Sequence, residues 1–84
     1  MAYDAIGFVL ITTAPAKEHD VYMKVKKLKS MDAEVEYVEP LFGEYDMIAK
    51  IRATDFNAFG QLVVGAVKTI PGVVETKPLT AIIQ

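Results

Sequence analysis

The run of residues 6–13 places the strongest limit on how this chain folds. Successive residues of a strand point to opposite faces of a sheet. Both sets are apolar here: Ile6, Phe8 and Leu10 on one face, and Gly7, Val9 and Ile11 on the other. Such a strand is covered on both faces. The run is too short to span a membrane, and no basic segment precedes it as in a signal peptide. We therefore predict a central strand of a sheet, and neither a membrane anchor nor a leader.

Two later segments have helical spacing of their apolar residues. Val21, Val25 and Leu28 fall at i, i+4 and i+7, which predicts a helix over about residues 17–30. A second helix is predicted over about residues 56–69, with Thr54 or Asp55 as its N-cap. Its buried stripe is expected to contain Phe56, Phe59, Val63, Val67 and Ile70, widened by Leu62 and Ala66. Gly60 and Gly65 weaken this helix, and we expect them to pack closely against the sheet.

Three further segments read as strands, over residues 35–41, 47–53 and 73 to about 82. The turn Gly43-Glu44-Tyr45-Asp46 joins the first two, and its glycine can supply positive φ. The order is strand, helix, strand, strand, helix, strand, which predicts an α+β, ferredoxin-like βαββαβ sandwich. Its four-stranded antiparallel sheet would carry two helices on one face, with the first and third strands in the middle. Pro40 and Pro78 fit edge strands.

Composition limits the class of protein further. A chain of 84 residues makes one small domain with a marginal core, yet 52% of its residues are apolar and none is cysteine. Small unstapled domains of this kind commonly gain burial by oligomerising. We therefore expect a homodimer packed sheet to sheet, which would cover the bare sheet face. The absence of cysteine suits a reducing cytosol, so we expect a cytoplasmic protein. A net charge of −2 gives no electrostatic basis for binding nucleic acid.

The sequence contains little that indicates catalysis. His19 is the only histidine, and with no cysteine no spacing suggests a metal site. No Ser or Thr is placed beside a base, and no glycine-rich loop precedes a helix, so we expect no catalytic residues and no cofactor. Glu44 and Asp46 lie at a hairpin tip, where desolvation is too small to tune an acid–base pair. These two acids are either a solvated turn or an acceptor for the ammonium end of a small ligand.

Four segments together resemble a known family. Gly43-Glu44-Tyr45-Asp46, Thr54-Asp55-Phe56, Ile70-Pro71-Gly72-Val73 and Glu75-Thr76-Lys77 are similar to the effector-binding (RAM) domain of Lrp/AsnC transcription regulators. The resemblance covers essentially the whole chain. Family regulators carry an N-terminal helix-turn-helix, whereas here the domain begins almost at Met1. We therefore expect residues 1–84 to form a stand-alone RAM-type domain without a DNA-binding domain.

The resemblance implies an assembly and a ligand. Family domains dimerise through their sheets, the dimers form rings of eight or ten subunits, and free amino acids bind in clefts between dimers. The residues that would line the cleft come from the hairpin and the last strand: Gly43, Glu44, Tyr45, Asp46, Thr76, Leu79, Thr80 and Ala81. Asp46 or Glu44 suits the α-ammonium, whereas backbone N–H groups and threonine hydroxyls suit the α-carboxylate.

Two functions from different classes follow. The first is a non-enzymatic amino-acid-binding module that oligomerises and modulates full-length Lrp/AsnC regulators or amino-acid metabolism. The alternative is a small dimeric ferredoxin-like enzyme, such as a cofactor-free monooxygenase or isomerase. Such enzymes place a His, Asn or acid in a deep pocket, for which His19 at a helix start is poorly placed. Ligand-induced stabilisation without turnover would favour the first function.

Overall fold

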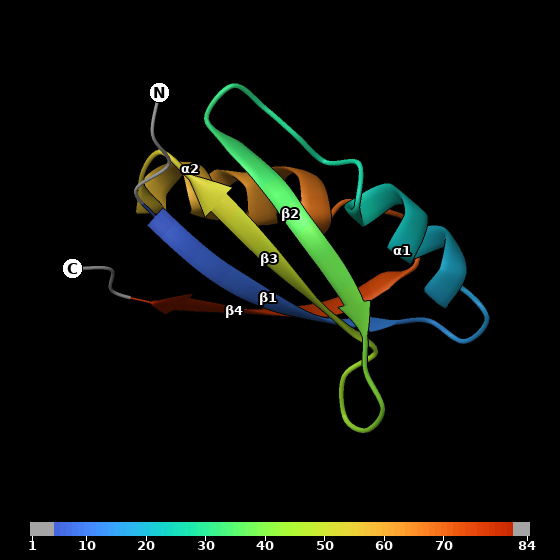
Figure 1. The fold of residues 1–84 in the computed structure, drawn as a ribbon. Coiled ribbons are helices and arrows are strands. Elements are labelled where there is room, and N and C mark those ends of the chain that lie inside the picture. The colour runs from blue at the N-terminus through green and yellow to red at the C-terminus, as the bar shows by residue number, and fades with distance from the viewer. Residues whose placement is uncertain (1–4, 82–84) are drawn as a thin grey trace.

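The computed structural model of the chain describes residues 5–81. The elements follow the predicted order (Figure 1): β1 Ala5–Thr13, α1 Glu18–Val25, β2 Ala33–Pro40, β3 Met47–Ala53, α2 Phe56–Leu62, the π-helix η1 Val63–Val67 and β4 Val73–Ala81. The βαββαβ, ferredoxin-like fold predicted from the sequence is confirmed. The expected end of the last strand at Ile82 lies outside the described residues.

All four strands belong to one antiparallel sheet in the order β2-β3-β1-β4. The two central strands are β1 and β3, as predicted, and the proline-containing strands β2 and β4 lie at the edges. The helices cover one face of this sheet (Figure 1). In the register, Ile11 lies opposite Met47 on one side and Thr76 on the other.

The core lies between the sheet and the helices. Burial alternates along both central strands, so that every second residue of β1 and β3 is buried. The fully buried side chains with the largest volumes are Ile11, Met47, Ile51, Val9, Val21, Val25 and Val67. Gly7 belongs to the same face, and a Cβ atom at this position would overlap the ring of Phe59. The glycine therefore makes room for the aromatic ring of α2 on the sheet.

The opposite sheet face has no helix on it. Ile6, Phe8 and Leu10 of β1 point to this open face and are only partly buried, while Tyr37 and Leu79 are 40% and 42% exposed. The Glu36 carboxylate lies 3.7 Å from Lys50 Nζ and 3.5 Å from Arg52 Nη1. The Arg52 Nε is buried without a hydrogen-bond partner among the described residues. The open face is thus an apolar strip bordered by charged side chains.

The first helix is shorter than the sequence predicts. It ends at Val25, and Leu28, which was expected on its stripe, lies beyond it. The cause is the pairing of the next segment with β2: the Val35 N–H donates to the Leu28 carbonyl at 3.1 Å, and Lys29 bridges to Glu34. The chain therefore leaves the helix early, and Leu28 packs on the core from an extended segment.

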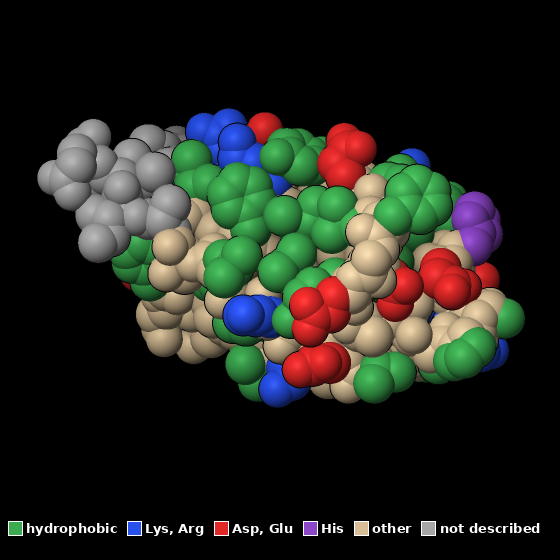
Figure 2. Space-filling model, turned by 90° about the horizontal axis from the view of Figure 1, so that it is seen from below, with side chains coloured by type: hydrophobic (Ala, Val, Ile, Leu, Met, Phe, Trp, Pro, Cys, Tyr) green, Lys and Arg blue, Asp and Glu red, His purple; other side chains and the backbone are tan. Residues whose placement is uncertain are grey.

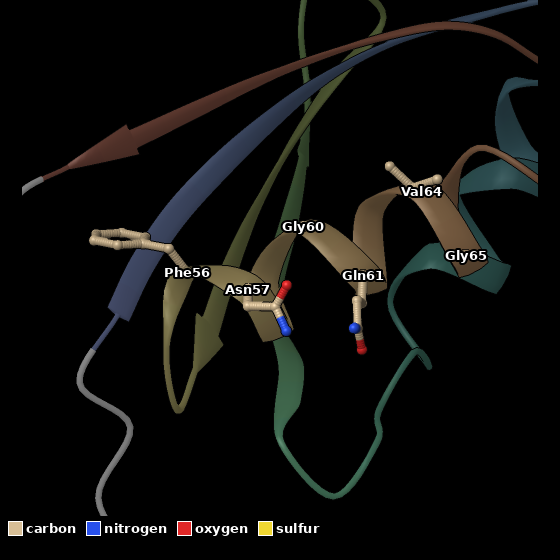
Figure 3. Close-up of a pocket in the computed structure, with 6 residues that line it drawn as sticks. All are labelled: Phe56, Asn57, Gly60, Gln61, Val64 and Gly65. Atoms are coloured by element: carbon tan, nitrogen blue, oxygen red, sulfur yellow. The ribbon is translucent and has the colours of Figure 1, made fainter.

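The second helix differs from the prediction in three respects. It widens into η1, where the Lys68 N–H donates to the Val63 carbonyl at 2.9 Å, an i→i+5 bond. Phe56, expected to be buried, is 47% exposed, because it is the first helical residue and its side chain extends away from the first turn (Figure 3). Gly60 and Gly65 were expected against the sheet, but a Cβ atom on either glycine would have no neighbour within 4 Å. They face outward, whereas Phe59, Leu62, Val63, Val67 and Ile70 are buried as expected.

Within residues 5–81, none of the helices combines the length and apolar character needed to cross a membrane.

Candidate ligand-binding site at the β2–β3 hairpin

Residues 41–46 form the hairpin that joins β2 to β3 and projects from the body of the domain (Figure 1). The Leu41 N–H donates to the Asp46 carbonyl at 2.9 Å and closes the loop. Gly43 has φ of +119°, a conformation that residues with a side chain rarely adopt. Phe42 and Glu44 are exposed, whereas Tyr45 and Asp46 are partly buried. The positive φ expected at Gly43 is confirmed.

Asp46 ties the base of this hairpin to the end of β1. Its Oδ2 accepts hydrogen bonds from the Thr13 backbone N–H at 2.7 Å and from Thr13 Oγ1 at 3.1 Å. The Asp46 N–H donates to the Ile11 carbonyl at 2.9 Å. Thr13 is itself buried, with 8% of its surface exposed. The carboxylate therefore has a structural partner 33 residues away, which the local sequence pattern does not reveal.

A hollow of about 320 Å³ lies between this tether and the start of α1. It is lined by Glu18, His19 and Tyr22 of α1 and by Pro40, Asp46 and Met47 at the ends of β2 and β3. Figure 2 views the side toward which the hairpin projects, and shows hydrophobic side chains gathered across its middle with acidic side chains among them. Two carboxylates, a phenol and an apolar wall suit a small molecule with a cationic end. Sequence reasoning missed the three α1 residues, because only the fold brings that helix to the hairpin.

The β4 residues of the predicted site are spread along the sheet. Thr76 lies opposite Ile11, the residue whose carbonyl Asp46 contacts, so Thr76 and Asp46 flank the same end of β1. Leu79, Thr80 and Ala81 lie opposite Phe8, Gly7 and Ile6. The rise of a strand separates Gly7 from Ile11 by about 13 Å. A single chain therefore brings Thr76 near the hairpin but leaves Leu79, Thr80 and Ala81 toward the other end of the sheet.

The predicted β4 residues also lie on different faces. Thr76 and Thr80 are opposite Ile11 and Gly7, so they share the helix-covered face, whereas Leu79 is opposite Phe8 on the open face. Among the described residues, no group of three or more His, Cys, Asp and Glu side chains is placed to hold a metal ion. His19, expected to be an ordinary residue at a helix start, is exposed at the rim of the hollow.

The fold and the geometry of the site define this chain as a ferredoxin-like domain with a hollow beside its β2–β3 hairpin. Residues 6–82 match the model of the Lrp/AsnC ligand binding domain, so the chain belongs to this family. The resemblance inferred from the sequence is thereby confirmed. None of the curated protein sequences matches the chain.

Solved structures share the fold. A hypothetical protein from Pyrococcus horikoshii is 26% identical with a TM-score of 0.79, over 95% of this chain and 92% of that one. AsnC of Escherichia coli is 19% identical with a TM-score of 0.84, over 98% of this chain and 53% of that one. A transcriptional regulator from Neisseria meningitidis, solved as its L-Met complex, is 22% identical with a TM-score of 0.74, over 94% of this chain and 50% of that one. This chain thus spans about half the length of these two regulators.

Proposed function

We propose that this domain is a non-enzymatic sensor of free amino acids, with its ligand held at the hairpin. The membership of a ligand-binding family supports this function, and the Neisseria meningitidis regulator was solved with an amino acid. The observation that carries the proposal is the position of Asp46: a partly buried carboxylate at the edge of a hollow large enough for an amino acid.

The chemistry of Asp46 suits an α-ammonium group. A carboxylate offers about four acceptor positions. Its Oδ2 receives two hydrogen bonds from Thr13, and none of the hydrogen bonds found in the described residues ends on Oδ1. A charge-assisted bond from an ammonium to this oxygen would be shorter and stronger than a neutral one. Glu18 on the opposite wall and Glu44 at the tip add negative potential.

A neighbouring subunit would complete the proposed site. The α-carboxylate needs donors, for which backbone N–H groups around Gly43 and the hydroxyls of Thr76 and Thr80 are suited. Because Thr80 lies about 13 Å along the sheet from the hairpin end of its own chain, we propose that these β4 residues, with Leu79 and Ala81, come from an adjacent dimer. Tyr45, Leu79 and Ala81 would then favour ligands with neutral side chains.

The assembly that this arrangement needs is a ring. We propose that two copies pack their open sheet faces together, and that such dimers associate into an octamer or decamer through hairpins and β4. The apolar strip of Ile6, Phe8 and Leu10 supports the first contact. The exposed hairpin, with Phe42 fully exposed and Leu41 38% exposed, supports the second.

We further propose that this domain acts in the cytoplasm through association with other members of its family. It would modulate full-length Lrp/AsnC regulators by entering mixed assemblies with them. The net charge of −2 supports a role that does not depend on direct contact with nucleic acid. Association with a purified family regulator, measured with and without amino acids, tests this role.

The small dimeric enzyme predicted as the alternative would need a sequestered acid or base. His19 is exposed, and the hollow beside it is open to solvent rather than deep between the helices and the sheet. We propose binding without turnover. A spectral screen with candidate substrates would detect a reaction if the protein were such an enzyme.

Calorimetry with methionine and the other amino acids tests the ligand and the role of Asp46 together. Asp46→Asn keeps an oxygen that can accept from Thr13 but removes the charge that would hold an ammonium. We expect this variant to bind more weakly by about 1.5–3 kcal/mol, the worth of a hydrogen bond to a charged group, with its free energy of unfolding little changed.

Thr13→Val is the matched control, because it removes one hydrogen bond to Asp46 and leaves the carboxylate charged. It should lower stability by about 0.5–1.5 kcal/mol and leave the affinity of the folded protein unchanged. If Asp46→Asn binds amino acids as tightly as the wild type, Asp46 has only the structural role that its bonds to Thr13 describe.

A further inference from the structure

The outward face of α2 and η1 takes no part in the hairpin site or the open sheet face. It forms a shallow hollow of about 500 Å³, lined by Phe56, Asn57, Gly60, Gln61, Val64 and Gly65 (Figure 3). Val64 is 62% exposed and Phe56 is 47% exposed. Figure 3 shows Asn57 and Gln61 pointing the same way from the helix. An apolar hollow with two amides beside it is thus left uncovered by the other residues that the structure describes.

The charge pattern of this face is unusual for an exposed helix. No charged residue occurs between Asp55 and Lys68, whereas solvent-facing helix surfaces normally carry charged side chains. The two ends of the segment have opposite charge, because Asp55 is the N-cap of α2 and Lys68 is the C-cap of η1. When two such segments pack antiparallel, the acid at the start of each lies beside the base at the end of the other.

The backbone is also open on this face. Gly60 and Gly65 weaken a helix relative to alanine, and beyond the helix itself no atom of the described residues lies within 4 Å of the place where either Cβ would be. Packing within residues 5–81 therefore does not account for them. Glycines on an exposed helix face allow another helix to approach the backbone closely.

We propose that this face is a two-fold interface between two copies of the chain, in which α2 and η1 pack antiparallel to the same helices of the partner. A two-fold contact pairs a surface with itself. The midpoint between Asp55 and Lys68 falls at Gln61 and Leu62, so each acid would meet the partner's base across the axis. Gln61 is exposed near that axis, and its amide can both donate to and accept from its own copy.

This contact is separate from the proposed ligand-binding ring. The α2 and η1 helices lie on the covered side of the sheet, away from the open face that would form the sheet-to-sheet dimer (Figure 1). The helix contact would therefore join units already formed through the sheet.

A single cysteine tests the geometry cleanly, because the chain contains none of its own. Gln61→Cys should form a covalent dimer under mild oxidation, seen on a non-reducing gel. The two-fold axis brings the two sulfurs together, so cross-linking should be at least about tenfold faster than for Lys24→Cys on the exposed side of α1. Equal rates for the two variants, with both folded by circular dichroism, would overturn the proposal.

A second variant tests the contact without a disulfide. Gly65→Glu replaces a weak helix former by a better one, but places a long charged side chain where the partner's helix would approach the backbone. We expect light scattering to show the loss of one association step. Lys24→Gln, which also changes the net charge by −1, should assemble as the wild type does. An unchanged assembly mass for folded Gly65→Glu would contradict the interface.

Discussion

Among the glycines of the described chain, Gly7 leaves the least room for a side chain, because the ring of Phe59 from α2 packs against it. The ring of Phe59 lies over Gly7, where a methyl group would overlap the Cε1 and Cζ atoms of the ring. The sequence does not reveal this contact, because Gly7 reads as one more residue of an apolar strand. Gly7 is needed here because a residue without a Cβ atom leaves room for the ring of Phe59.

We expect Gly7→Ala to destabilise the domain by about 1–3 kcal/mol, the usual cost of adding atoms to a packed core. Phe59→Leu should lower stability through lost burial, but it should also make room for the new methyl group. The double variant is then more stable than the sum of the two single changes predicts. Denaturant unfolding measures all four states of this cycle, and strict additivity would show that the ring and the glycine do not share one space.

Asp46 illustrates how far local sequence reasoning extends at a single residue. The turn around Gly43 and the acid after it were both apparent from the sequence. Which group the carboxylate bonds was not, because Thr13 is 33 residues away and reaches Asp46 only once β1 and β3 are paired. The ligand-binding role assigned to Asp46 stays a prediction that the calorimetry above tests, and the roles of Glu44, Thr76 and Thr80 stay predictions as well.

Among the elements, the strands follow their sequence patterns most closely. The apolar run 6–13 and the segment 47–53 predicted β1 and β3 to within one residue at each end, and burial alternates along both strands. The helices were predicted less closely. The stripe through Leu28 continues with helical spacing, yet the pairing of Leu28 and Lys29 with β2 ends α1 at Val25. The i→i+5 bonding of η1 has no signal in the spacing of the apolar residues.

The N-cap of α2 gives an element-scale prediction. Asp55 Oδ1 accepts from the Ala58 N–H at 2.8 Å, as expected for one of the two candidate caps. Asp55→Ala leaves that donor without its side-chain partner and should cost about 0.5–2 kcal/mol of stability. Asp55→Asn retains the cap and is the control, with a loss of a few tenths at most. Thermal unfolding of both variants measures the difference, and equal losses would show that charge, rather than the cap, is what matters.

At the scale of the whole molecule, the open sheet face dominates the expected behaviour. The topology and the exposure of this face were predictable, because β1 is apolar on both faces while the helices cover only one. The charged border of this face was not predictable, because Glu36, Lys50 and Arg52 come together beside the apolar strip only when the strands pair. The buried Arg52 Nε, unpaired among residues 5–81, lies in this group.

Phe8→Asp should separate the proposed sheet-to-sheet dimer, because it places a charge in the middle of an interface of roughly 1,200 Å² or more. Lys24→Gln is the control, since Lys24 is exposed on α1 away from the open sheet face and its replacement also changes the net charge by −1. Light scattering gives the mass, and circular dichroism shows whether each variant is folded. A wild-type protein that is monomeric at micromolar concentration would remove the dimer from the proposal.

The two edge strands affect how readily this protein aggregates at high concentration. Each of β2 and β4 has a hydrogen-bonded neighbour on one side only, and exposed strand edges are templates on which other chains add strands and aggregate. Pro40 ends β2 and Pro78 lies within β4. Neither residue has an N–H to offer an incoming strand, and β2 is further distorted by the irregularity between Val35 and Tyr37. The edges of the sheet thus resist the addition of further strands, independently of the association proposed for its open face.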